Sequence, residues 1–158
     1  ARIPQDIINE LQCRSVVCFT GMTHDSASII GTQIKSYKEG KNDEALDKAK
    51  EIAIRMRTAM RHGDIDEAGN LLGESWESKK RFSDKITNPN IDNLYNLAIK
   101  NGAIGGKVSG AGGGGFMYFI TKYDKKPQLS KILQDAGAQV TDIQFEPEGV
   151  ISWRSRHD

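Results

Sequence analysis

The chain has 158 residues, with 22 Lys and Arg against 21 Asp and Glu, so its formal net charge is +1. This charge balance argues against a dedicated nucleic-acid-binding protein, which normally carries a basic excess. No apolar run approaches the roughly 20 residues that a membrane-spanning helix needs, and we expect no signal peptide. The two cysteines fit a reducing cytosol. We therefore expect residues 1–158 to form a single cytoplasmic domain.

The first two thirds of the chain are predicted to form one strand followed by four helices. Residues 11–20 are predicted as a buried strand because their second half is continuously apolar. Cys13 and Cys18 would then lie on opposite faces of this strand and would not pair. Helices are expected over residues 27–38, from Asp43 to His62, after a cap at Asp64, and from a cap at Asn90 to Gly102. Glu67 follows Asp64 by three residues and predicts a capping box.

The last third is predicted to be mostly strands. Residues 104–109 and 116–121 read as two strands joined by a glycine-rich turn, which implies antiparallel pairing. A helix is expected to open between Asp124 and Pro127, and further strands over residues 140–145 and 150–153. This order predicts an α+β fold, with helices packed on one face of an antiparallel sheet.

The glycine-rich turn is the strongest functional signal. Seven of the chain's 16 glycines lie between Gly105 and Gly115. Glycine loses more backbone freedom on folding than any other residue, so such a run indicates positive φ angles or close approach of a ligand. Backbone amides that converge in a tight loop suit an anion such as phosphate. A plain hairpin is the alternative, although hairpins usually need only one or two glycines.

Two better-known phosphate motifs do not fit this run. Gly110 to Gly115 satisfies the letters G-x-G-x-x-G, but that dinucleotide pattern must open a helix, and here a strand follows. A P-loop needs Ser or Thr after its Gly-Lys pair, whereas Val108 follows Gly106 and Lys107.

A second candidate site precedes the first predicted helix. Hydroxyls, a carboxylate and a helix N-terminus converge there, which suits a sugar or its phosphate; its residues are Thr20, Gly21, His24, Asp25 and Ser26. Ordinary helix capping by Thr23 or Asp25 explains the same residues. We expect no metal site, because His62 and His157 lack ligand spacing and read as surface residues. The aromatic residues Trp76, Phe82 and Tyr95 are expected in the core.

The segment from Lys107 to Phe116 resembles the third motif of the galactokinase, homoserine kinase, mevalonate kinase and phosphomevalonate kinase superfamily. Residues 17–21 and 145–153 resemble the start and end of the C-terminal domain in its sugar-kinase branch. Within that branch, the chain looks most like the D-glycero-D-manno-heptose 7-phosphate kinases. The resemblance covers essentially the whole chain, and implies the ferredoxin-like C-terminal half of a two-domain kinase whose N-terminal, ATP-binding half is absent.

The resemblance also implies an activity and a set of site residues. Such kinases use ATP with Mg²⁺ and transfer the γ-phosphoryl group to the anomeric hydroxyl of a heptose 7-phosphate. The phosphate donors implied here are the hydroxyl of Ser109 and the amides of Gly110, Ala111, Gly112, Gly113 and Gly114. Lys107 would add a positive charge, although a lysine before the loop is also typical of a solvated strand position. No catalytic residue is assigned.

Other functions remain open on the sequence. The acceptor sugar of such a kinase could also be fucose or galactose. A stand-alone α+β module that binds a phosphorylated ligand without chemistry would keep the same loop. A ferredoxin-like nucleic-acid binder is disfavoured by the neutral charge. A chain without its N-terminal half is expected to have no kinase activity and to expose an apolar patch.

Overall fold

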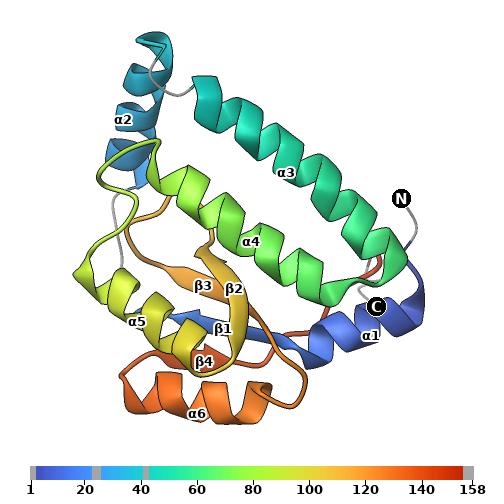
Figure 1. Ribbon diagram of the computed structural model, residues 1–158. Helices are drawn as coiled ribbons and strands as arrows, with labels where there is room; N and C mark the ends of the chain where they lie inside the picture. Colours follow the sequence, from blue (N-terminus) through green and yellow to red (C-terminus); the bar gives the residue numbers. More distant parts are fainter. Residues whose placement is uncertain (1–2, 23–25, 41–42, 155–158) are drawn as a thin grey trace.

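The computed structural model describes residues 3–22, 26–40 and 43–154 (Figure 1). Its elements are α1 (Gln5–Cys13), β1 (Ser15–Phe19), α2 (Ser26–Lys38), α3 (Asp43–His62), α4 (Ile65–Lys80), α5 (Pro89–Lys100), β2 (Ala103–Val108), β3 (Phe116–Thr121), α6 (Lys126–Asp135) and β4 (Gln139–Thr141). None of the helices in the described ranges is long and apolar enough to cross a membrane.

The four strands form one antiparallel sheet in the order β2-β3-β1-β4. Strands β1 and β2 run in the same direction with β3 between them, and β3 and β4 do so with β1 between them. This is the ferredoxin-like arrangement, with α2 to α5 in its first crossover and α6 in its second. The predicted α+β class and the hairpin around the glycine run are confirmed.

Helices cover both faces of the sheet, which corrects the expectation that they pack on one face (Figure 1). Neighbouring residues of a strand point to opposite faces. Phe119 packs in one buried cluster with Leu94 of α5 and Leu129 of α6. The next residue, Ile120, packs in a second cluster with residues of α3 and α4, such as Ile52. The cause is the nearly continuous apolar sequence of β3, which suits burial on both faces.

The start of the chain also differs from the prediction. Residues 5–13 form α1, and the strand begins only at Ser15. Ile7 and Leu11 lie four residues apart, so they share one face of α1 and pack against the second cluster. Cys13 ends α1 exposed, whereas Cys18 is buried in β1, and both thiols are free. The two cysteines therefore do not share a strand, which corrects the reason given for their not pairing.

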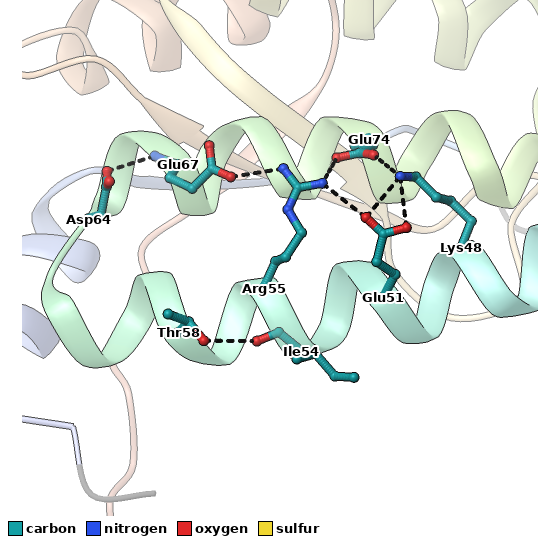
Figure 2. A network of polar contacts seen from close by, with 8 residues as sticks. All are labelled: Lys48, Glu51, Ile54, Arg55, Thr58, Asp64, Glu67 and Glu74. Atoms are coloured by element: carbon teal, nitrogen blue, oxygen red, sulfur yellow. Dashed lines mark hydrogen bonds and ion pairs between the residues drawn. The ribbon is translucent and has the colours of Figure 1, made fainter.

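The α3–α4 pair begins as predicted but without a complete capping box. Asp64 caps α4 by accepting a hydrogen bond from the amide of Glu67 at 2.9 Å. The Glu67 carboxylate does not return to the cap; it accepts from Arg55 of α3 at 3.0 Å (Figure 2). Arg55 also reaches Glu74 at 3.1 Å. These exposed ion pairs join α3 to α4 and stabilise the domain only modestly, whereas buried residues such as Ile52 and Leu71 form the packed contact between the two helices.

Helix α5 begins two residues earlier than predicted. Asn88 is its cap, because Oδ1 accepts from the amide of Ile91 at 3.0 Å and Pro89 occupies the first helical position. Asn90 instead donates from Nδ2 to the carbonyl of Thr20 at 3.1 Å. The Asn-Pro pair, interpreted as a turn, is therefore the start of the helix. The core placement of the aromatic side chains Trp76, Phe82 and Tyr95 is confirmed.

The end of the chain forms less sheet than predicted. Strand β4 covers only Gln139–Thr141, and residues 142–154 form neither strand nor helix. The predicted strand at residues 150–153 is therefore wrong, and its apolar side chains Val150, Ile151 and Trp153 are exposed. Apolar side chains are also exposed on α2, at Ile30, Ile34 and Tyr37.

Candidate functional site

The hairpin that carries the glycine run packs closely against α4, with the backbones of β2 and α4 in direct contact. A Cβ atom on Gly105 of β2 would lie 2.0 Å from the carbonyl oxygen of Gly69 and 2.8 Å from the amide nitrogen of Gly73, both on α4. A Cβ on Gly106 would lie 2.2 Å from the ring of Phe119. These two glycines are required by packing inside the fold, a reason beyond the positive φ angles and ligand approach that the glycine run predicted.

The loop itself, residues 109–115, is a fixed backbone structure that we call the glycine loop. The amide of Ser109 donates to the carbonyl of Phe116 at 2.8 Å and closes the hairpin. Positive φ angles occur at Gly110, Gly112, Gly113 and Gly115. A Cβ on Gly112 would lie 2.9 Å from the Cα and the carbonyl oxygen of Ile86. The loop therefore needs glycine for its backbone angles and also for its close packing on the segment that connects α4 to α5.

The amides of the glycine loop fall into two groups. Gly113 donates to the carbonyl of Ile86 at 2.7 Å, and Gly115 donates to that of Met22 at 2.9 Å. Among the described residues, the amides of Gly110, Ala111, Gly112 and Gly114 have no hydrogen-bond partner. Most of the predicted phosphate donors are therefore free, but the amide of Gly113 is already used within the fold. Ser109 and Gly110 lie exposed on the surface.

Two lysines lie at the base of the glycine loop. Lys107 is half-buried rather than solvated, and its Nζ donates to Oγ of Ser75 on α4 at 3.1 Å. Lys79, also on α4, donates to the carbonyls of Val108 at 3.4 Å and of Gly110. Burial lowers the pKa of Lys79 to about 8, with a further contribution from the charge of Lys107, whose pKa burial also lowers. In the part of the chain that the structure describes, neither lysine has a carboxylate partner.

Replacing Lys79 with methionine is expected to change how stability depends on pH. In the unfolded chain Lys79 keeps its proton up to its ordinary pKa of 10.5, but in the folded chain it loses the proton near pH 8. The unfolded state binds more protons between these values, so this group makes the free energy of unfolding rise as pH increases through that window.

Urea unfolding of the wild-type chain and of Lys79→Met, at pH values below, within and above the window, measures this contribution. The free energy of unfolding of the wild type, minus that of Lys79→Met, should increase as pH rises through the window. Tyr118 and Cys18, whose pKa values burial raises, titrate in both proteins, so their effect largely cancels. A difference that stays constant with pH would contradict the lowered pKa.

The second candidate site lies next to the glycine loop. The amide of Thr20 donates to the carbonyl of Gly115 at 2.9 Å, and Gly21 has a φ angle of 77°. Ser26 is the first residue of α2. His24 and Asp25, like the alternative cap Thr23, lie outside the described residues, so their predicted roles stay predictions. The fold therefore brings Thr20 and Gly21 to the glycine loop, although about 95 residues separate them along the chain.

Three side chains that contact the glycine loop were not predicted from the sequence. Gln33 of α2 donates from Nε2 to the carbonyl of Ala111 at 3.1 Å, and Asn88 donates from Nδ2 to that of Gly113 at 3.0 Å. Lys79, described above, is the third. They come from separate parts of the first crossover, so no local spacing in the sequence links them to the loop.

The described residues contain no group of three or more His, Cys, Asp or Glu side chains that could hold a metal ion. His62 is exposed, as predicted, and its Nδ1 lies 2.9 Å from the carbonyl oxygen of Thr58. His157 lies outside the described residues.

Comparison with known families identifies the domain. The profile described as "GHMP kinases C terminal" matches residues 56–139, which include α4, α5, the glycine loop and α6. The chain belongs to the GHMP kinases. The resemblance stated from the motif at Lys107 to Phe116 is thereby confirmed, and the domain is the C-terminal one of that family.

Individual relatives agree with this assignment. The chain is 40% identical over 153 residues to a Campylobacter jejuni protein named D-glycero-alpha-D-manno-heptose 7-phosphate kinase, covering 97% of this chain and 45% of that protein. It is similar to the solved structure of a D-glycero-D-manno-heptose 1-phosphate kinase from Bacteroides thetaiotaomicron, with a TM-score of 0.61 and 28% identity, covering 92% of this chain and 37% of that one.

A more distant structure shares the fold alone. The L. major mevalonate kinase matches with a TM-score of 0.71 but 21% identity, covering 77% of this chain and 37% of its own. The chain thus spans less than half the length of each relative described here.

Proposed function

We propose that this GHMP-kinase domain is the C-terminal half of an ATP-dependent kinase that phosphorylates a heptose 7-phosphate. The observation that carries the proposal is the glycine loop, whose amides at Gly110, Ala111, Gly112 and Gly114 are free among the described residues. Phosphoryl transfer depends on positioning and charge neutralisation more than on covalent chemistry by the protein. A rigid set of amide donors contributes to positioning, and the two neighbouring cations contribute to charge neutralisation.

Each group at the site has a proposed role. The free amides of the loop, with the hydroxyl of Ser109, donate to phosphate oxygens of ATP. Lys107 and Lys79 lie at the base of the loop and make the local potential positive. Thr20 adjoins Gly115, and we propose that Thr20 and Gly21, with the predicted residues His24, Asp25 and Ser26, hold the sugar phosphate.

The site fits the phosphates of ATP better than it fits Mg²⁺. The loop offers hydrogen-bond donors, whereas Mg²⁺ prefers carboxylate and other oxygen ligands. Since the described residues contain no cluster of acidic ligands, we propose that the Mg²⁺ ligands lie on an N-terminal half. That half would also supply the main grip on ATP, so this domain alone is proposed to be inactive.

The proposal is tested with two proteins: the 158-residue chain, and the product of the same coding sequence extended upstream of Ala1. Each is assayed for ATP-dependent phosphorylation of heptose 7-phosphate, with fucose and galactose as competing acceptors. We expect transfer to heptose 7-phosphate by the extended protein and no ATP turnover by the 158-residue chain.

Three other outcomes would each overturn part of the proposal. ATP turnover by the 158-residue chain would contradict the division of labour between two halves. Preference for fucose or galactose would contradict the acceptor. A start codon close to Ala1, with phosphate binding but no transfer, would select a stand-alone binding module instead.

A further inference from the structure

We propose that Gln33, Lys79 and Asn88 are positioning residues of the glycine loop. Each holds a loop carbonyl, and together they turn the amides of Ala111, Gly112 and Gly114 outward toward a phosphate group. The orientation of the loop stands on geometry alone, whereas the phosphate as its ligand rests on the proposed function.

The three side chains approach the loop from three different parts of the fold. Gln33 lies on α2, Lys79 lies near the end of α4, and Asn88 caps α5. Their donors reach the carbonyl oxygens of Ala111 at 3.1 Å, of Gly110, and of Gly113 at 3.0 Å respectively. Lys79 also donates to Val108 at 3.4 Å, which anchors it at the base of the loop.

Because the peptide bond is planar, a contact that holds a carbonyl oxygen also sets the direction of the next N–H group. In a trans peptide the carbonyl oxygen and the following N–H point in opposite directions, and the described residues contain no cis peptide. Holding the carbonyls of Gly110, Ala111 and Gly113 therefore directs the N–H groups of Ala111, Gly112 and Gly114 away from the three side chains. These N–H groups are among those without a partner in the described ranges.

Two further peptides of the loop follow the opposite rule. The amides of Gly113 and Gly115 point inward, donating to the carbonyls of Ile86 and Met22. The carbonyls of the same peptides, on Gly112 and Gly114, accept no hydrogen bond from any described residue. Each of these five peptides is thus held at one end only, and the end that is held decides which group faces outward.

Side chains are needed for this because glycine permits both orientations. Each of the three held peptides has glycine on at least one side, where rotation meets little steric penalty, so the backbone alone does not select one direction. Asn88 is itself fixed, because its Oδ1 accepts from the amide of Ile91 at 3.0 Å, which leaves its Nδ2 facing Gly113. The start of α5 and one peptide of the loop are therefore held by the same side chain.

Three variants remove one donor each. Asn88→Asp keeps a side-chain oxygen for the α5 cap but removes the donor to Gly113. Lys79→Met and Gln33→Met remove the other two donors while keeping comparable side-chain length. Lys79→Arg restores a cationic donor. Lys85→Met is the matched control, because Lys85 is an exposed neighbour that contacts Ser28 and not the loop.

The ¹H–¹⁵N spectrum of the full 158-residue chain is recorded while inorganic triphosphate with Mg²⁺ is added. In the wild type, the amides of Ala111, Gly112 and Gly114 should shift more than those of Gly113 and Gly115. Each donor-removing variant should shift or broaden the loop amides before any ligand is added, and should raise the titration midpoint about tenfold, the effect of losing one hydrogen bond. Lys79→Arg should recover part of the change seen in Lys79→Met, and Lys85→Met should behave like the wild type.

The outcomes separate the two parts of the proposal. If all three donor-removing variants keep the wild-type loop spectrum and midpoint, these residues do not position the loop. If the variants change the loop spectrum but triphosphate shifts no amide in the wild type, the positioning stands and the phosphate role fails together with the proposed function. If the other two variants unfold, Gln33→Met alone still tests the positioning role. Gln33 lies within a largely exposed helix and caps no helix end, so this variant should stay folded.

Discussion

Replacing Gly105 with alanine is expected to lower the free energy of unfolding by about 3 kcal/mol or more. The new Cβ would meet the carbonyl oxygen of Gly69 at 2.0 Å and the amide nitrogen of Gly73 at 2.8 Å. Both atoms belong to the backbone of α4, so no side chain can rotate away. Either α4 or β2 must shift, which would disturb the packing that seats the hairpin.

Urea denaturation measures this effect, with Gly31→Ala as the control. Gly31 lies inside α2, and a Cβ there would meet nothing within 4 Å. Alanine is favoured over glycine in a helix by up to about 1 kcal/mol, so the control should become slightly more stable. Equal effects of the two substitutions would show that the close approach of α4 and β2 is not required.

Replacing Gly112 with alanine is expected to lower kcat/KM for ATP about 100-fold in the extended protein, the scale of losing one positioned backbone donor. Gly112 has a φ angle of 112°, which an alanine rarely adopts, and its Cβ would lie 2.9 Å from the backbone of Ile86. The substitution therefore strains the backbone and lifts the loop from its seat at the same time. The backbone strain should also cost about 2 kcal/mol of stability.

Substitutions at two other glycines separate the effect of the backbone angle from that of the contact with Ile86. Gly110 has a φ angle of 76° but open space around its Cβ position, so Gly110→Ala tests the backbone angle alone. Gly149 lies in open space without a positive φ, so Gly149→Ala should change nothing. Activity of Gly112→Ala close to the wild type would contradict the proposed role of the loop amides.

Local patterns predicted the parts of the fold that local interactions determine. The apolar β-branched and aromatic run at residues 116–121, directly after the glycines, was enough to predict the hairpin. The helix from Asp43 to His62 and the helix after Asp64 followed from their local start and stop signals. Helix α1 was missed because Leu11 was assigned to the strand that follows, although Ile7 and Leu11 already have helical spacing. The continuous apolar sequences of β1 and β3 indicate burial on both faces of the sheet, but which helices cover each face depends on tertiary packing that a single strand does not reveal.

For the candidate site too, the sequence revealed the local features but not the contacts between distant segments. The glycine loop is one continuous segment, so its composition revealed it. The sequence could not show that Gly105 and Gly106 serve the contact with α4 and the ring of Phe119, because those contacts join distant segments. Lys79 and Gln33 were missed for the same reason, since ordinary helical positions gave no sign that they reach a loop near residue 111.

Asn88 joins two structures that are otherwise separate, the first turn of α5 and the glycine loop. By thermodynamic reciprocity, whatever immobilises the carbonyl of Gly113 must also strengthen the first turn of the helix, and fraying of that turn must loosen the loop. Opening of the helix end is a low-energy local fluctuation. If phosphate binds the loop as proposed, the exchange of the Ile91 amide hydrogen with solvent should slow, because Asn88 links that amide to the loop.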